Sequence, residues 1–117
     1  MTYDLPALPD PGDGLATLAE AFTIATTWHA QSGSSLAAAI DARNANRPTV
    51  AAAHYIAACC CMIVAQTARS VAAQIDPQRG DAEGGVCPAT LDFLEWASVA
   101  AATSTTAARS LDEAGAS

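Results

Sequence analysis

Apolar residues recur every three or four positions along most of the chain, which is the spacing of one face of an α-helix. Leu15, Leu18 and Phe22 follow this spacing, and the pattern predicts a first helix from residue 13 or 14 to about residue 31. The serines and the glycine at 32–34 are typical of a helix break. We therefore expect a second, short helix that begins at residue 34 or 35 and ends near residue 46.

The segment from Pro48 to Ile75 predicts the longest helix, because proline suits a first helical turn and no formally charged residue lies between Arg47 and Arg69. A helix that is apolar on nearly all sides is either the centre of a bundle or a membrane span. Residues 50–68 are long enough to cross a bilayer. They are rich in alanine and include His54, however, and alanine contributes little to insertion while histidine is costly in lipid. The sequence therefore favours a central bundle helix over a membrane span at 50–68.

The rest of the chain completes a helical bundle. Residues 76–86 are polar and rich in glycine, which predicts a loop, and apolar residues at helical spacing predict a last helix from about Ala89 to Glu113. Prolines at positions 6, 9 and 11 predict an extended N-terminal arm over 1–13, and 114–117 is expected to be a C-terminal tail. The expected fold is all-α: about four helices in an up-and-down bundle that forms a single domain over 14–113.

Composition strengthens the helical prediction. Alanine, the best helix former, accounts for 30 of the 117 residues, and aromatic residues make up only 5%. Small side chains allow helix axes to approach one another closely. Together with the apolar third helix, this surplus of smooth apolar surface predicts contacts with a protein partner, either in a homodimer or in a larger assembly.

The charge balance narrows the range of partners. The chain has 5 arginines, no lysine and 12 acidic residues, for a formal net charge of −7. This balance disfavours nonspecific binding to nucleic acids and to anionic membrane surfaces, so we expect no nucleic-acid partner. The N-terminus has no basic segment followed by an apolar run, and the four cysteines do not form a disulfide framework. We therefore expect a reduced, cytoplasmic compartment.

Three adjacent cysteines at 59–61 invite a metal interpretation. Neighbouring residues on a helix diverge by about 100°, so three adjacent thiols cannot close one tetrahedral site. His54 and Cys61 share a helix face, and Cys87 could join them only through tertiary contact. These three are the candidate metal ligands, although core packing is the favoured role of the cysteines.

Two other pairs of residues are candidates for ligand binding. His54 and Tyr55 form a polar pair inside the apolar helix, and they predict either a ligand site in the bundle, centred on this pair and Cys61, or a histidine satisfied by a hydrogen bond. Trp28 and Trp96 lie in different predicted helices. They are expected to pack together in the core or to line a groove for a ligand or partner.

Arg47 and His54 are separated by six residues, a spacing that resembles the Arg–His motif of HEPN-type ribonucleases. Members of that family are helical bundles that act as dimers. The resemblance covers eight residues and implies that Arg47 would stabilise a phosphate while His54 would handle a proton. It makes these two residues the candidate catalytic groups.

The sequence contains no phosphate-binding glycine loop, zinc-protease motif, nucleophile elbow or kinase motif, and we expect no cofactor. The leading hypothesis is a small acidic bundle that acts through protein contacts rather than through catalysis. The alternatives are a ligand- or metal-binding bundle around His54 and Cys61, and a HEPN-like ribonuclease.

Overall fold

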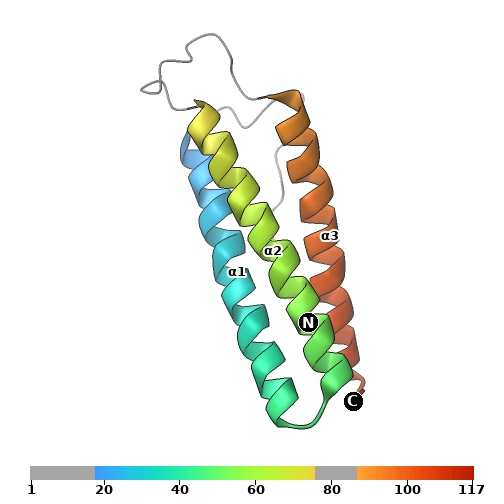
Figure 1. Cartoon of the computed structure of the whole chain (residues 1–117). Helices are drawn as coiled ribbons and strands as arrows, with labels where there is room; N and C mark the ends of the chain where they lie inside the picture. The colour runs from blue at the N-terminus through green and yellow to red at the C-terminus, as the bar shows by residue number, and fades with distance from the viewer. Residues whose placement is uncertain (1–17, 76–86) are drawn as a thin grey trace.

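The computed structural model describes residues 18–75 and 87–117 of the chain. They form three long helices, α1 (Leu18–Asn44), α2 (Pro48–Ile75) and α3 (Pro88–Glu113), which run alternately up and down (Figure 1). No strand occurs among these residues, which confirms the all-α prediction. The predicted arm over 1–13 and the predicted loop over 76–86 lie outside the described residues.

The predicted break at residues 32–34 is wrong: α1 continues through it, so the described part of the chain has three helices instead of about four. Two hydroxyl groups at the expected break, those of Ser32 and Ser35, are bonded within the helix. Ser32 Oγ donates to the carbonyl oxygen of His29 at 2.7 Å, and Ser35 Oγ accepts from Gln31 Nε2 at 3.1 Å. Ser32 and Ser35 are both buried. A mid-helix glycine costs only about 1 kcal/mol, so the packing of this segment outweighs the local preference of Gly33.

The turn between α1 and α2 is short and specified by local residues. Asn46 adopts a left-handed conformation with φ 59°, which asparagine tolerates better than most residues. The amide of Arg47 then donates to the carbonyl oxygen of Ala42 at 2.9 Å. Pro48 begins α2, where its missing amide hydrogen costs nothing. Helix α2 has the bounds that the sequence predicts, and α3 begins one residue earlier than expected.

Helix α2 lies between α1 and α3 and packs against both (Figure 1). Among the residues that the structure describes, Trp28 of α1 is the one large aromatic side chain in the core, and it is 1% exposed. It packs among Val64 and Val71 of α2 and Leu94 of α3. Most of the other core positions are small and let the helix backbones approach closely; the small ones are Ala21, Ala25, Cys61, Ala65, Ala68, Ala72 and Ala101.

The predicted C-terminal tail folds back onto the start of α2. The amide of Thr49 donates to the carbonyl oxygen of Ser117 at 2.8 Å, and the amide of Ala116 donates to that of Leu111 at 3.0 Å. Leu111 and Ala116 pack against a small second cluster of buried residues, Ala42, Val50 and Ala51. The tail therefore closes the end of the bundle at which α1 turns into α2.

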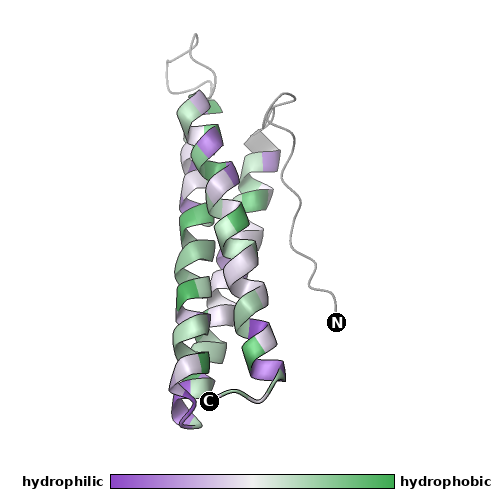
Figure 2. Cartoon of the chain, turned by 90° about the vertical axis from the view of Figure 1, so that its right-hand side faces the viewer, coloured by the Kyte–Doolittle hydropathy of each residue, from purple (hydrophilic) through white to green (hydrophobic). Residues whose placement is uncertain are grey.

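By length and composition alone, α2 could cross a membrane. The core helix of a soluble protein can have the same length and composition, and 39% of the apolar window of α2 is buried inside the bundle. Figure 2 shows that apolar positions occur along the full length of the three helices. Some of these positions face outward, and they form one of the two features described next.

Candidate functional site

Arg47, directly before α2, and His54 of α2 both face Asp112, near the end of α3. Arg47 Nη1 donates to Asp112 Oδ1 at 2.6 Å, and His54 Nε2 lies 3.8 Å from Asp112 Oδ2. His54 Nε2 is buried and has no hydrogen-bond partner. The side chain of His54 is 11% exposed, compared with 29% for Arg47 and 47% for Asp112. The carboxylate thus lies between a guanidinium group and an imidazole.

Arg47 makes further bonds to the chain end. Its Nη2 donates to the carbonyl oxygen of Asp112 at 3.3 Å, and its Nε donates to that of Ala116 at 3.0 Å. The last carbonyl groups of a helix carry partial negative charge and attract cations. Arg47 is therefore held by α3 and the tail, which gives it a structural role in this arrangement.

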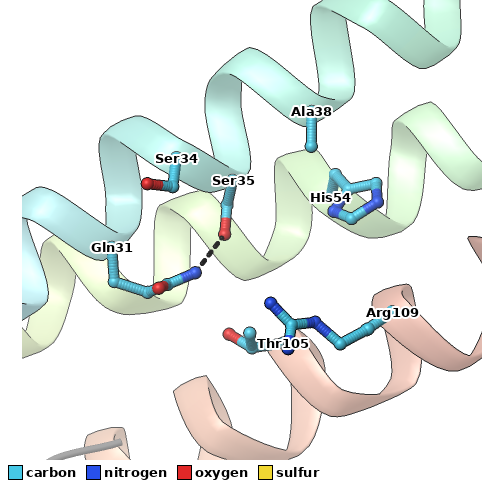
Figure 3. Close-up of a pocket in the computed structure, with 7 residues that line it drawn as sticks. All are labelled: Gln31, Ser34, Ser35, Ala38, His54, Thr105 and Arg109. Atoms are coloured by element: carbon cyan, nitrogen blue, oxygen red, sulfur yellow. Dashed lines mark hydrogen bonds between the residues drawn. The ribbon is translucent and has the colours of Figure 1, made fainter. Parts of the chain in front are cut away.

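A cavity of about 180 Å³ lies between the three helices beside His54 (Figure 3). Helix α1 contributes Gln31, Ser35 and neighbouring residues, and α3 contributes Thr105 and Arg109. In Figure 3 the side chains of Gln31 and Arg109 extend toward the space between α1 and α3, and the ring of His54 forms the wall from α2. The complete lining is Gln31, Ser34, Ser35, Ala38, His54, Thr105 and Arg109.

The lining of this cavity is rich in hydrogen-bond donors. It contains a guanidinium group, an imidazole, a carboxamide and three hydroxyl groups, and none of the lining residues is aspartate or glutamate. Thr105 Oγ1 donates to the carbonyl oxygen of Ala101 at 2.7 Å, so its hydrogen is directed to its own helix. Ser35 Oγ accepts from Gln31, which leaves its hydrogen for another acceptor. The lining therefore offers both hydrogen-bond donors and acceptors to a small polar ligand.

Most of this lining was missed at the sequence level, where only His54 was selected. The sequence of α3 did contain one indication of a polar site. Its buried positions are Leu94, Ser98, Ala101, Thr105 and Ala108, which follow helical spacing but include two hydroxyl residues on the inward face. Polar residues at core-facing positions indicate a local polar environment. Arg109 gave no such signal, because a lone arginine near a helix end is ordinarily solvated.

The other predicted ligand-binding residues lie elsewhere. Tyr55 is half-buried and does not line the cavity. Trp28 is buried in the core, whereas Trp96 is 75% exposed on α3. The two tryptophans therefore do not pack together, which rules out one of the two predicted arrangements. Trp28 is too buried to line a groove, so only Trp96 lies where a partner could cover it.

The candidate metal ligands are not brought together. The amide of Cys87 donates to Gln74 Oε1 at 2.8 Å, which places Cys87 20 residues along α2 from His54, or about 30 Å at 1.5 Å per residue. Cys61 Sγ lies 3.6 Å from Thr105 Oγ1, while His54 faces Asp112. Within residues 18–75 and 87–117, no three His, Cys, Asp or Glu side chains are grouped as a metal site requires.

The thiols differ in their surroundings. Burial raises the pKa of Cys61 above its ordinary value of 9.0, against the lowering effect of its hydrogen bond with Thr105. Cys87 is exposed at the start of α3, where the backbone amides of Thr90 and Ala89 lower the pKa of its thiol. Cys59 is exposed, Cys60 is partly buried, and all four described thiols are free. Cys61 therefore packs in the core, while Cys87 is the thiol best placed to react.

A second feature is a row of exposed apolar side chains along α2 and α3, which we name the apolar strip. It consists of Ile56, Ile63, Phe93 and Trp96, with exposed fractions of 58%, 42%, 54% and 75%. Ile63 and Phe93 line one shallow groove between the two helices. Ile56 lies two helical turns from Ile63, and Trp96 lies one turn from Phe93, so each pair shares a side of its helix.

Comparison of the chain with protein-family models, with curated proteins and with solved structures finds no match. The functional conclusions therefore depend on the geometry of the two features alone. The cavity offers donors to a small molecule, and the apolar strip offers a surface to a macromolecule.

Proposed function

We propose that this chain acts through protein contacts, as a homodimer that is joined along the apolar strip. The observation that carries the proposal is the exposure of Trp96, at 75%, beside three other large apolar side chains that are about half exposed. Single exposed apolar residues are common, but a contiguous group of them is typical of an interaction surface. Tryptophan in particular is enriched at the centres of protein interfaces.

Charge favours a second copy as the occupant of the strip. The chain carries a net charge of −7, so two copies repel one another unless they meet on an uncharged surface. Helix α2 has no charged residue between Arg47 and Arg69, and this stretch includes both of its strip residues. On α3, Asp92 borders the strip one turn before Trp96, as charges do at the rim of an interface. A neutral apolar surface can face its own copy across a two-fold axis, as a dimer requires.

The placement of the four residues also suits a two-fold axis. Phe93 shares the groove with Ser70, which lies two turns beyond Ile63 along α2, and Ile56 lies two turns before it. Ile63 is therefore midway along the strip. An axis that passes near Ile63 brings Phe93 of the second copy to the level of Ile56, so that an exposed aromatic side chain covers an exposed aliphatic one.

The test is the mass of the protein in solution, measured by sedimentation and light scattering over a range of concentrations. We expect the wild type to be a dimer and Ile63→Asp to be a monomer with unchanged helicity. Two aspartates near one axis would be buried together without partners, which should weaken the dimer at least about 100-fold. Phe22→Asp is the matched control, because Phe22 is 52% exposed on α1 and lies outside the strip.

Two results would contradict the proposal. One is a wild-type protein that remains monomeric at about 100 µM, well above the usual range for specific dimers. The other is an equal loss of association in Ile63→Asp and Phe22→Asp, which would show that the strip has no special role. A monomer that floats with neutral phospholipid vesicles would assign the strip to a membrane surface instead.

A further inference from the structure

We propose that the proline-containing N-terminal segment of the same chain, residues 3–11, docks on the aromatic end of the apolar strip and thereby limits self-association. The segment lies outside the described residues, and its sequence supplies the chemistry of the occupant. Because this competition regulates the homodimer, it rests on that proposed function. It follows from the pattern of the segment, the lining of the groove and the length of chain between them.

The N-terminal segment has the sequence pattern of a polyproline II ligand. Pro6 and Pro9 form a PxxP motif, and polyproline II has three residues per turn, so positions three apart share an edge. Two of the three edges are apolar, and the third is acidic. The apolar edges are Leu5, Leu8 and Pro11, and Tyr3, Pro6 and Pro9; the acidic edge is Asp4, Ala7 and Asp10. A segment of this kind can cover an apolar surface while its charges stay in water.

The apolar strip offers the kind of surface that binds such segments. Proline-rich segments dock in grooves lined by aromatic side chains, because their preformed conformation loses little entropy on binding. Phe93 and Trp96 are exposed one turn apart on α3. Phe93 borders a groove of about 600 Å³ whose α2 wall includes Ile63 and Gln66. The carboxamide of Gln66 offers a donor to the carbonyl groups of polyproline II, which make no hydrogen bonds within their own helix.

The segment is attached within reach of this groove. Helix α1 starts at Leu18, at the end of the bundle where α2 ends and α3 begins (Figure 1). The groove opens at the same end, because Gln74 and Ala89 line it. The seven steps from Leu18 back to Pro11 span at most about 25 Å, and the bundle is 20–23 Å wide. So short a tether gives the segment an effective concentration in the millimolar range, at which even a weak contact is populated.

A docked segment lowers self-association because Ile63 and Phe93 serve both contacts. A segment docked in about two-thirds of the molecules leaves about one-third of them competent to pair. Two competent copies must meet, so the apparent dissociation constant of the dimer rises about ninefold. The segment is thus an intramolecular competitor, and the dimer forms at a higher protein concentration than the strip alone would require.

Matched variants of the full chain test the competition by changing one edge of the segment. Leu5→Asn combined with Leu8→Asn removes an apolar edge, whereas Ala7→Asn places the same residue type on the acidic edge. We expect the double variant to dimerise about ninefold more tightly than the wild type, as the competing state is lost. Ala7→Asn should dimerise as the wild type does. Sedimentation over a range of concentrations gives the dissociation constants, and circular dichroism checks that helicity is unchanged.

Docking itself is measured in samples dilute enough to be monomeric by sedimentation. Each of the three proteins also carries Trp28→Phe, which leaves Trp96 as the only tryptophan. Quenching of its fluorescence by acrylamide reports how much of the ring is covered. We expect quenching to be up to about threefold more efficient in the double variant, because the uncovered fraction rises from about one-third to one. Ala7→Asn should be quenched as the wild type is.

The docked segment and the homodimer fail separately in these measurements. Equal quenching in all three proteins overturns docking, whatever their mass in solution. Stronger quenching in the double variant without a dimer at any concentration supports docking and contradicts the homodimer. A double variant that dimerises more weakly than the wild type overturns the competition, because the segment then belongs to the interface between copies.

Discussion

Arg47 and Asp112 are 65 residues apart in the sequence, and their side chains join at 2.6 Å between Nη1 and Oδ1. The same guanidinium group donates to the carbonyl oxygens of Asp112 and Ala116. One side chain at the start of α2 thereby fastens both the last turn of α3 and the C-terminal tail. The two strongest functional features, the cavity and the apolar strip, depend on how α3 is placed against α2, and this contact fixes one end of that pair.

Loss of the Arg47 bonds to α3 and the C-terminal tail should lower the stability of the bundle modestly. We expect Arg47→Ala to lower the free energy of unfolding by about 1–2 kcal/mol, because it loses one partly exposed ion pair and two hydrogen bonds to carbonyl groups. Arg47→Lys should have an intermediate effect, since an ammonium group cannot reproduce the fork of a guanidinium. Urea unfolding followed by circular dichroism gives the comparison. Arg43→Ala, at an exposed position, should change the free energy by less than about 0.5 kcal/mol. An equal loss of stability in Arg43→Ala would contradict a stabilising role for the contacts of Arg47 with Asp112 and Ala116.

The two tryptophans should differ sharply. Trp28 is 1% exposed and Trp96 is 75% exposed, so Trp28→Ala creates a large cavity whereas Trp96→Ala leaves none. We expect the first substitution to cost about 3–5 kcal/mol of the free energy of unfolding. The second should cost less than about 0.5 kcal/mol in a dilute sample in which only monomer is present. Fluorescence of the two single-tryptophan variants adds a direct readout: the protein that retains only Trp28, made by Trp96→Phe, should emit at a shorter wavelength than the one made by Trp28→Phe.

The thiols should react in a fixed order. The amides at the start of α3 lower the pKa of Cys87, and burial raises that of Cys61. At pH 7–8 a lower pKa leaves more of the thiol as reactive thiolate, so we expect iodoacetamide to modify Cys87 first and Cys61 last. Mass spectrometry of peptides after timed quenching measures the order. Both shifts also set the response to pH: labelling of Cys87 should set in at lower pH than that of Cys61. Faster labelling of Cys61 in the folded protein would contradict this account.

The same shift predicts a loss of stability at high pH. Because the folded state raises the pKa of Cys61, the folded protein holds the thiol proton more tightly than the unfolded chain does. The stabilisation is fully present below the ordinary pKa of 9.0 and is lost as the pH rises from there toward the pKa of the folded state. We expect Cys61→Ala to unfold with a smaller change between pH 8 and pH 10 than the wild type, measured by urea titration at each pH. Cys59→Ala, at an exposed position, should retain the wild-type dependence.

The alanines at the helix contacts should tolerate no enlargement. Ala65 is fully buried where α2 meets its neighbours, whereas Ala52 on the same helix is exposed. Ala65→Leu forces three additional carbon atoms into a closely packed contact and should cost about 1–3 kcal/mol or more. Ala52→Leu should be nearly neutral. Thermal unfolding of both variants is the measurement, and a stable Ala65→Leu would show that the contact holds spare volume.

Much of the helical architecture could be predicted from local signals. Pro48 marked the start of α2, and the uncharged stretch between Arg47 and Arg69 indicated a helix with little exposure to water. The local signal at residues 32–34 was misleading, because the burial of Ser32 and Ser35 against the bundle outweighs the preference of Gly33 for a break. His54 could be chosen from the sequence as a candidate site residue, because it is a polar residue in an apolar helix. The residues of α1 and α3 that surround it could not be predicted.

The sequence by itself determined that this protein is helical and acidic and that its core is built from small residues, because helix propensity, charge and side-chain volume are properties of single positions. Only the tertiary structure decided which side of each helix is covered. It buries Trp28 and exposes Trp96, although both residues lie in amphipathic patterns. It also brings Gln31, His54 and Arg109 from three helices to one cavity. Such groupings depend on the rotation and register of helices against one another, which are set by the packing of the entire bundle and are not encoded in any single segment.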